Sequence, residues 1–458
     1  MNYGLLTFVP IIVVIALALK TRKTLFSLII GTLLCYIIIS GVGFYEGWTG
    51  AIFRAACKQT NQWVFLVCML FGSLIALLGA SHGTLGFSRL LERFCVGPKS
   101  TLIVTWIMGV IIFIDDYLNI MTLSVCMKKL SDKNRIPREA LSYVIDSTGA
   151  PVCAILPLST WAVFFSELFY DNAGIKALGY GGPMQTFFHV IPVSFYAIFA
   201  IAIVPLFALG LAPKMGRMRR AYERVKKTGK VYSPESTMLN AEEESSESID
   251  VNLKGNILDF IIPIGVLIAS AIAVGDLFIS VLAAIFACFV LYVPRKKISF
   301  QRFCDLAMYG FSNMVPTVAI IFFAFVMQEA MGDIRIANYL IEMVSPYASA
   351  ALLPAIAFVV VAALNFSTSS VWGIPAIVTP IILPLAFKIG ADPVLVMGAI
   401  VSGATFGSHA CFYSDATVLT SSCCKMENMD HALSQFPYSL LAAGLALVGY
   451  VACGFIMT

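Results

Sequence analysis

Two adjacent carboxylates end an uninterrupted apolar run in the stretch Gly109-Val110-Ile111-Ile112-Phe113-Ile114-Asp115-Asp116-Tyr117-Leu118-Asn119. An ionisable side chain within the hydrocarbon of a bilayer costs about 2.5–3.5 kcal/mol on insertion scales, so its presence there indicates a function. A polar break inside a hydrophobic segment is typical of the discontinuous helices of transporters. The stretch therefore predicts an all-α membrane protein whose spanning helices are broken or re-entrant.

The rest of the chain has the composition of a polytopic membrane protein. Of its 458 residues, 59% are hydrophobic and only 12% are charged, whereas charged residues make up about a quarter of a soluble domain. Several apolar runs approach the roughly 20 residues that span hydrocarbon. About 10 to 12 membrane segments can be drawn from such runs, among them Phe8 to Leu19, Leu25 to Ile39, Ile257 to Ala273 and Val281 to Val293.

A polar linker, residues 214–256, divides the chain into residues 1–213 and 257–458. Its first part is basic and its second part, Glu242 to Ser248, is acidic and rich in serine. Basic loops stay on the cytoplasmic side of a membrane, so we expect a cytoplasmic, solvated tether in a multi-pass protein of the bacterial inner (plasma) membrane. The positive charges are clustered in a few loops and do not form a surface that could bind nucleic acid. We therefore expect membrane lipid, and not nucleic acid, to contact the protein.

The two parts of the chain present the same features in the same order. Polar breaks at Asp115–Asn119 and Asn365–Ser370 are each followed by a second break, at Asp146–Pro151 and Gly407–Asp415. The loop after the first break is basic in the first part and nearly neutral in the second. This asymmetry predicts two repeats of inverted topology, with a binding site where the broken helices meet.

The topology of residues 101–127 stays open, because basic residues lie on both sides of this segment. Either the segment is re-entrant, or the amphipathic stretch from Phe87 to Phe94 lies along the membrane interface and has little preference for one side.

The carboxylates at the breaks are candidates for binding a cation or a proton. Adjacent acids in a low dielectric repel, so one of the pair at Asp115 and Asp116 is expected to hold either a proton or a cation. At Asp146, neighbouring prolines free backbone carbonyls that could also bind a cation. Helix capping is the structural alternative for these acids. The predicted cation- and proton-binding residues are Asp115, Asp116, Asn119, Asp146, Ser147, Thr148 and Asp415, with Asp115, Asp116 and Asp146 as ligands of Na+.

Hydroxyl and aromatic side chains at the same breaks are candidates for binding a small organic solute. Their structural alternatives are hydrogen bonds to the neighbouring backbone and ordinary packing. The predicted substrate-binding residues are Ser159, Trp161, Asn365, Ser367, Thr368, Ser369, Ser370, Trp372, His409, Tyr413, Ser414 and Thr417.

At these breaks the sequence resembles the NhaC family of sodium/proton antiporters, within the wider ion-transporter superfamily. The resemblance implies an inverted-repeat fold, sodium-coupled antiport, and a homodimer in which a transport domain moves against a scaffold. It is carried by Phe113 to Asn119, Ile145 to Cys153, Pro157 to Trp161, Ser367 to Gly373 and Ser414 to Thr417.

One motif departs from that family. Where the family commonly has Gly-Asp-His-Cys-Ser-Pro-Ile-Ser-Asp, this chain has Gly407-Ser408-His409-Ala410-Cys411-Phe412-Tyr413-Ser414-Asp415. Loss of an acid and gain of aromatic bulk favour an alternative, the sodium- or proton-coupled transport of an amino acid or small organic acid. We expect no cofactor beyond the coupling ions Na+ and H+. We also expect no enzymatic activity, because the chain lacks an HExxH motif and a glycine-flanked pair of intramembrane acids.

Overall fold

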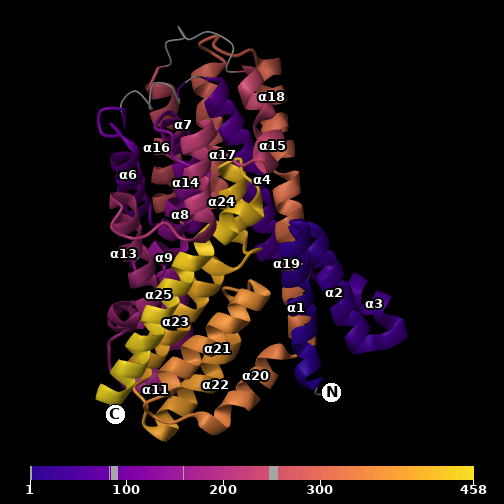
Figure 1. The fold of residues 1–458 in the computed structure, drawn as a ribbon, viewed down its shortest axis with the longest axis vertical. Coiled ribbons are helices and arrows are strands. Elements are labelled where there is room, and N and C mark those ends of the chain that lie inside the picture. Colours follow the sequence, from indigo (N-terminus) through magenta and orange to yellow (C-terminus); the bar gives the residue numbers. More distant parts are fainter. Residues whose placement is uncertain (1–2, 82, 84–90, 158, 247–255, 458) are drawn as a thin grey trace.

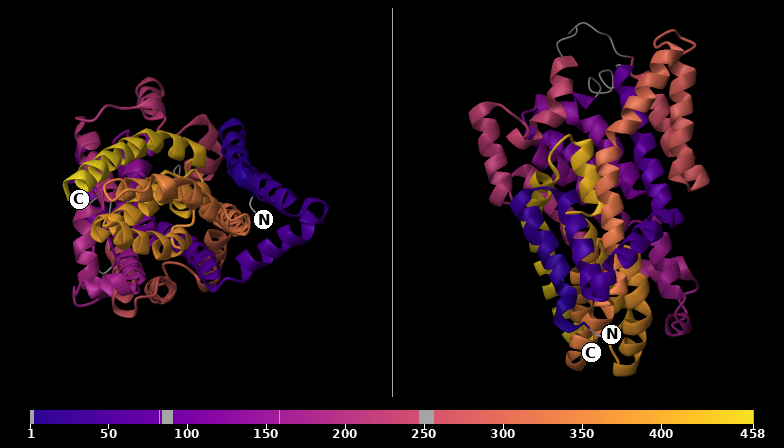
Figure 2. Two further views of the ribbon diagram at one scale, coloured as in Figure 1. Left: turned by 90° about the horizontal axis from the view of Figure 1, so that it is seen from below. Right: turned by 90° about the vertical axis from the view of Figure 1, so that its right-hand side faces the viewer.

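The chain is an elongated bundle of helices, and both termini lie near one end of it (Figures 1 and 2). The computed structural model describes residues 3–81, 83, 91–157, 159–246 and 256–457, and every regular element among them is a helix. The first half of the predicted amphipathic stretch at residues 87–94, residues 87–90, lies outside the described residues. The predicted all-α class is confirmed.

Residues 1–213 form the first set of helices. Gly109 on α6 lies so close to Thr148 on α8 that a Cβ atom there would overlap the threonine side chain. These two helices therefore pack tightly at the level of the first pair of breaks. The set comprises α1 (Val9–Thr21), α2 (Thr24–Ser40), α3 (Phe44–Cys57), α4 (Gln59–Ala80), α6 (Pro98–Ile111), α7 (Asp116–Lys133), α8 (Arg138–Thr148), α9 (Ala150–Cys153), α10 (Thr160–Tyr170), α11 (Ala173–Ala177), α12 (Pro183–Val190) and α13 (Phe195–Leu209).

Residues 257–458 form the second set. Side-chain caps begin several of these helices, as sequence rules predict for Asp, Ser and Thr before a helix: Asp276 caps α17, Ser299 caps α18 and Asp392 caps α23. The set comprises α16 (Leu258–Val274), α17 (Leu277–Tyr292), α18 (Phe300–Asn313), α19 (Val315–Asp333), α20 (Ile336–Val344), α21 (Leu353–Thr368), α22 (Gly373–Ile389), α23 (Pro393–Ala410), α24 (Asp415–Cys423) and α25 (Asn428–Met457).

Many of these helices suit a membrane. Six helical stretches of the described chain are long and apolar enough to cross one, and a seventh arises if Pro183–Val193 and Phe195–Leu209, bent by 55°, form one span. Five shorter apolar helices have 10–17 residues. The protein is therefore a polytopic membrane protein.

The predicted breaks are confirmed as helix ends. α6 ends at Ile111 and α7 begins at Asp116, and α8 gives way to α9 at Gly149. In the second set, α21 ends before Ser369, and α23 and α24 are separated by residues 411–414. The inverted relation between the two sets remains a prediction.

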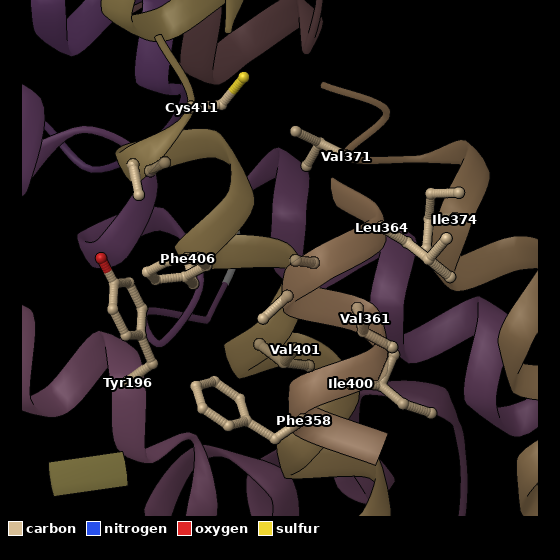
Figure 3. Packing of buried hydrophobic residues seen from close by; sticks show 14 of the residues in the cluster. Tyr196, Phe358, Val361, Leu364, Val371, Ile374, Ile400, Val401, Phe406 and Cys411 are labelled. Carbon is tan, nitrogen blue, oxygen red and sulfur yellow. The ribbon is translucent and has the colours of Figure 1, made fainter. Parts of the chain in front are cut away.

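Helices α21 and α23 pack closely in the core (Figure 3). A Cβ atom at Gly407 would overlap Asn365, and one at Gly403 would lie 2.7 Å from the Cβ of Val361. Phe358, Val361 and Val401 fill the space between the helices (Figure 3). The absence of side chains at the two glycines therefore lets α21 and α23 meet at the level of their breaks.

The described residues 214–246 of the linker make hydrogen bonds to the bundle, whereas the sequence predicted a solvated tether. It contains α14 (Gly216–Thr228) and α15 (Thr237–Ser246). Arg224 on α14 makes two bonds to the Glu139 carboxylate on α8, of 2.7 and 2.9 Å. Asn240 Nδ2 donates to the carbonyl of Lys425 at 2.9 Å, and the Glu427 amide donates to Ser236 Oγ at 2.9 Å. The linker thus joins α8 to the turn between α24 and α25.

Candidate functional site

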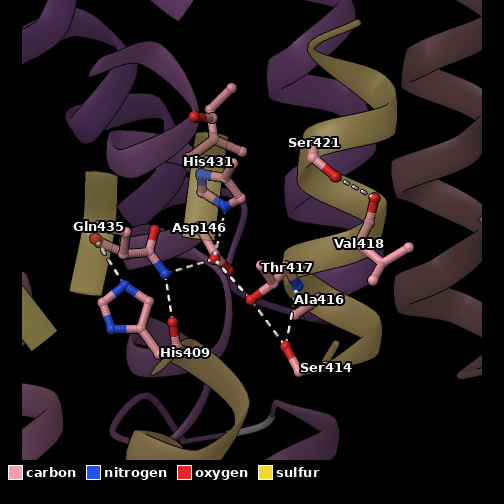
Figure 4. Close-up of polar contacts among 12 residues, drawn as sticks. Asp146, His409, Ser414, Ala416, Thr417, Val418, Ser421, His431 and Gln435 are labelled. Carbon is pink, nitrogen blue, oxygen red and sulfur yellow. Dashed lines mark hydrogen bonds and ion pairs between the residues drawn. The ribbon is translucent and has the colours of Figure 1, made fainter. Parts of the chain in front are cut away.

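Asp146 lies near the C-terminal end of α8 with no exposed surface. Its Oδ2 accepts hydrogen bonds from His431 Nε2 at 3.0 Å and from Gln435 Nε2 at 2.7 Å, both on α25 (Figure 4). Thr417 Oγ1 on α24 donates to the same oxygen at 3.4 Å. Three helices therefore converge on one carboxylate. We call Asp146, His409, Thr417, His431 and Gln435 the Asp146 cluster.

His409, near the end of α23, is held on both sides of its ring. Its Nε2 lies 2.9 Å from Ser147 Oγ on α8, and its Nδ1 lies 2.7 Å from the hydroxyl of Tyr196 on α13. The Gln435 amide donates to the backbone carbonyl of His409 (Figure 4). The ring is 2% exposed, so the predicted residues His409, Ser147 and Asp146 belong to one buried network.

Several buried polar atoms of this network have no hydrogen-bond partner among the described residues. They include Asp146 Oδ1, Gln435 Oε1, His431 Nδ1 and, one residue before His409, Ser408 Oγ. An unsatisfied buried polar group costs about 1–3 kcal/mol. Three of these atoms are oxygens, one of them from a carboxylate, and oxygen is the donor type that suits a small hard cation or a proton.

At the Asp115–Asp116 break, the first acid is bonded to the first turn of the helix that follows it, unlike Asp146. Asp115 is the N-cap of α7, because its Oδ1 accepts from the backbone N–H of Leu118 at 3.1 Å. Its Oδ2 accepts from Thr160 Oγ1 at 3.3 Å. The hydroxyl of Tyr117 donates to Asp415 Oδ2, so this break is joined to the start of α24. Asp115 and Asp116 are buried, at 6% and 7% exposure.

Asn119 uses its amide to close the break between α6 and α7. Its Nδ2 donates to the carbonyls of Gly109 and Ile112, at 2.6 and 2.7 Å. These carbonyls lie near the C-terminal end of α6, where backbone acceptors lack intrahelical partners. Asn119 Oδ1, the predicted cation ligand, has no hydrogen-bond partner among the described residues.

Asp115 and Asp146, both predicted as ligands of sodium, have different hydrogen-bond partners in this structure. Asp146 is surrounded by α24 and α25, whereas Asp115 is engaged at the start of α7. Among the described residues, no group of three or more His, Cys, Asp or Glu side chains is placed to hold a metal ion. The assignment of Asp115, Asp116 and Asp146 as ligands of sodium therefore stays a prediction, and Asp115 also serves as the cap of α7.

Most of the predicted substrate hydroxyls satisfy the backbone. Thr368 Oγ1 donates to the Leu364 carbonyl at 2.7 Å, and Ser367 Oγ donates to that of Ala363. Ser159 caps α10 and Ser414 caps α24. Ser369 closes α21 with a positive φ of 55°, and Ser370 accepts a bond from Gln328.

The predicted aromatic residues divide into two groups. Trp161 packs on Trp372, with ring centroids 5.3 Å apart, and forms a cluster between α10 and α22. Tyr413 instead bridges the two second-set breaks, since its hydroxyl donates to the Ser367 carbonyl at 2.5 Å. Asn365 is fully buried, and neither polar atom of its side chain has a partner among the described residues.

Sequence reasoning missed His431, Gln435 and Tyr196. A signal was available for the first two, because they are four residues apart on α25 and such residues share one face of a helix. The full stripe is Asn428, His431, Gln435 and Ser439, within a helix that is otherwise mostly apolar. Tyr196 has no comparable signal, because its place beside His409 depends on the packing of α13 against α23.

Comparison with known proteins adds a family match. A model described as the Na+/H+ antiporter family matches residues 162–455, which contain His409, Thr417, His431 and Gln435 but not Asp146. A Haemophilus influenzae protein described as uncharacterized is 27% identical, covering 98% of this chain and 91% of that protein. The Alcanivorax borkumensis YdaH transporter has 13% identity and a TM-score of 0.38, covering 90% of this chain and 89% of its own. Neisseria gonorrhoeae MtrF, assigned to a class of antimetabolite efflux pumps, has 12% identity and a TM-score of 0.37, covering 91% and 85%.

Proposed function

The chain belongs to the Na+/H+ antiporter family and is a secondary transporter, and from this premise we propose that it exchanges sodium for protons at the Asp146 cluster. The family match confirms the resemblance inferred from the sequence. Exchange of one ion for another requires a site that each can occupy in turn. Asp146 is the residue that fits this requirement best.

The observation that carries the proposal is the state of the two Asp146 oxygens. One is fixed by donors from α24 and α25, and the other has no partner although the residue has no exposed surface. A carboxylate can be neutralised either by a proton or by a cation. It must lose the proton before it binds sodium, so competition at this carboxylate would couple the two ion flows.

The other predicted acids take supporting roles in this proposal. Asp115 caps α7, and its capping bonds are explained without an ion. Asp116 and Asp415 remain candidates for holding protons, because both are buried and Asp415 is joined to the first set through Tyr117. We further propose that the linker faces the cytoplasm of a bacterial cell, which the basic composition of residues 214–230 supports. We also propose that the two helix sets are inverted repeats, which the matching order of their polar breaks supports.

No contact in the described chain favours the organic-solute alternative. The aromatic residues that suggested it are used for packing and for closing the breaks. Phe412 packs on Phe366 and Phe436, with ring centroids 5.4 and 5.3 Å apart, and Tyr413 holds the Ser367 carbonyl. The packing of Phe412 and the hydrogen bond of Tyr413 account for the presence of these large side chains without a bound solute.

Reconstitution of the purified protein in liposomes tests the proposal. With an imposed pH gradient, we expect uptake of radioactive sodium and a matching proton flux. Asp146→Asn keeps the side-chain volume but removes the titratable charge, so it should reduce both fluxes to the level of empty liposomes. Asp171→Asn, at a side chain that is 91% exposed, is the matched control and should transport normally. Proton-coupled flux of amino or organic acids without sodium flux would contradict the proposal and favour the alternative.

A further inference from the structure

The Gln435 side chain is 1% exposed and lies between two acceptors from different helices. Its Nε2 donates to Asp146 Oδ2 at 2.7 Å and to the carbonyl oxygen of His409 (Figure 4). These bonds use both N–H groups of the amide. Turning the amide over would place Oε1 against a carboxylate oxygen and a carbonyl oxygen, which repel it. The two acceptors therefore fix which atom of Gln435 is the oxygen.

Gln435 Oε1 is then a buried acceptor with nothing in the described chain to bind. Asp146 Oδ1 is in the same state, and Ser408 Oγ on α23 is a third buried oxygen without a partner. Buried polar atoms in native proteins are nearly always paired, and exceptions call for an explanation such as an ion. These three oxygens belong to residues that are joined to one another, because Gln435 is bonded both to Asp146 and to His409, the residue that follows Ser408.

The surroundings favour a positive ligand. α23 ends beside the cluster, and the C-terminal end of a helix carries a partial negative charge. The carbonyls of its last turn are fixed in place, that of His409 by Gln435 and that of Ser408 by Ser414 Oγ at 2.5 Å. The Asp146 carboxylate lies in the same hydrogen-bonded network.

From this geometry we propose a cation site whose oxygen ligands are Asp146 Oδ1, Gln435 Oε1 and Ser408 Oγ, with Gln435 as the residue that restricts it to monovalent cations. The inference rests on the proposed function and deepens it by naming the ligands. One carboxylate balances one positive charge, whereas proteins hold Ca²⁺ with several oxygen ligands that usually include more than one carboxylate. Gln435 supplies an oxygen without adding a second negative charge. Sodium, a hard cation of unit charge, fits this set.

Thermal unfolding of the purified full-length protein in detergent tests the site directly. Sodium chloride is titrated against choline chloride at constant ionic strength, and calcium chloride is titrated separately. Gln435→Leu removes the oxygen at similar volume and should raise the sodium concentration for half-maximal stabilisation by roughly 10- to 100-fold, the usual effect of losing a residue that supports a metal site. Gln435→Glu adds the second carboxylate and should make the protein respond to calcium, which does not stabilise the wild type.

Ser439→Ala is the matched control. Ser439 is buried one turn further along α25, and its hydroxyl lies 3.5 Å from His409 Nδ1. This variant should leave the sodium midpoint unchanged. A sodium midpoint as large in Ser439→Ala as in Gln435→Leu would contradict a specific role for Gln435.

The outcomes separate this inference from the function it rests on. If the wild type exchanges sodium for protons and both Gln435 variants keep its cation response, the ligand assignment is wrong but exchange at Asp146 stands. If the wild type neither exchanges nor is stabilised by sodium, the proposed function itself fails. Should Gln435→Leu not fold, Gln435→Glu decides alone, because lack of a calcium response would contradict the charge argument.

Discussion

Asp115 and Asp146 have the same sequence context, an acid where an apolar helix breaks, yet their surroundings differ. Asp115 precedes the first turn of α7, where backbone N–H groups lack intrahelical partners, and one of these bonds its carboxylate. Asp146 lies in the last turn of α8, where the N–H groups are already used and the helix dipole is unfavourable for an anion. It therefore takes its donors from other helices.

This contrast teaches that the position of an acid within a half-helix decides what it can do. An acid at the N-terminal end is consumed by capping. An acid at the C-terminal end remains available, and here one of its oxygens has no partner among the described residues. Asp415, the first residue of α24, is also engaged locally, since its Oδ1 accepts from the amide of Ala416 at 2.9 Å, although Ser414 is the cap of this helix.

Among the residues that surround the two aspartates, the largest effect is expected at His431. His431→Leu removes the 3.0 Å bond to Asp146, and a hydrogen bond to a charged group contributes about 1.5–3 kcal/mol. We expect sodium–proton exchange in liposomes to fall by roughly 10- to 100-fold. The corresponding change at Asp115, Thr160→Val, removes a 3.3 Å bond and leaves the cap intact. Equal losses in the two variants would break the contrast.

A smaller effect is expected from removing the cap itself. Asp115→Ala should lower the free energy of unfolding by about 1 kcal/mol, as for other N-caps, whereas Asp115→Asn should be nearly neutral because Asn caps as well as Asp. Denaturation in detergent, followed by circular dichroism, measures the difference. If Asn were as harmful as Ala, the carboxylate charge rather than the capping geometry would matter at this position.

The sequence predicted the four breaks because each interrupts a long apolar run with polar residues, a local signal. It did not predict how the acids are partnered. His431 is 285 residues from Asp146, and only the packing of α25 against α8 brings them together. The docked linker was missed for the same reason: the composition of residues 214–256 is that of a solvated segment, and the bonds from Arg224 to Glu139 span 85 residues.

The smallest effect concerns the turn that leads into α25. Burial, and then the charge of Asp430, raise the pKa of Glu427 to about 7 from 4.5. Its carboxylate also accepts from the Asp430 amide at 3.1 Å, and Arg22 opposes the shift. Because the folded state favours the protonated acid, stability is highest at low pH and falls as pH rises from about 4.5 through 7.

Glu427→Gln should weaken this pH dependence. We expect the unfolding temperature of the wild type to fall more between pH 5 and 8 than that of the variant. The variant changes the residue before α25, the helix that carries the partners of Asp146, and leaves the start of α7 unchanged. The capping bond of Asp115 should therefore be unaffected. An identical pH profile in both proteins would mean that Glu427 does not titrate on folding.

The most direct test of the account compares Asp146→Asn with Asp115→Asn in the same liposomes, with sodium-driven proton release followed by an entrapped pH-sensitive dye. Asparagine can replace aspartate as a cap but cannot exchange a proton for sodium. The account predicts that Asp115→Asn releases protons as the wild type does and that Asp146→Asn releases none. Loss of release in Asp115→Asn with normal release in Asp146→Asn would contradict it.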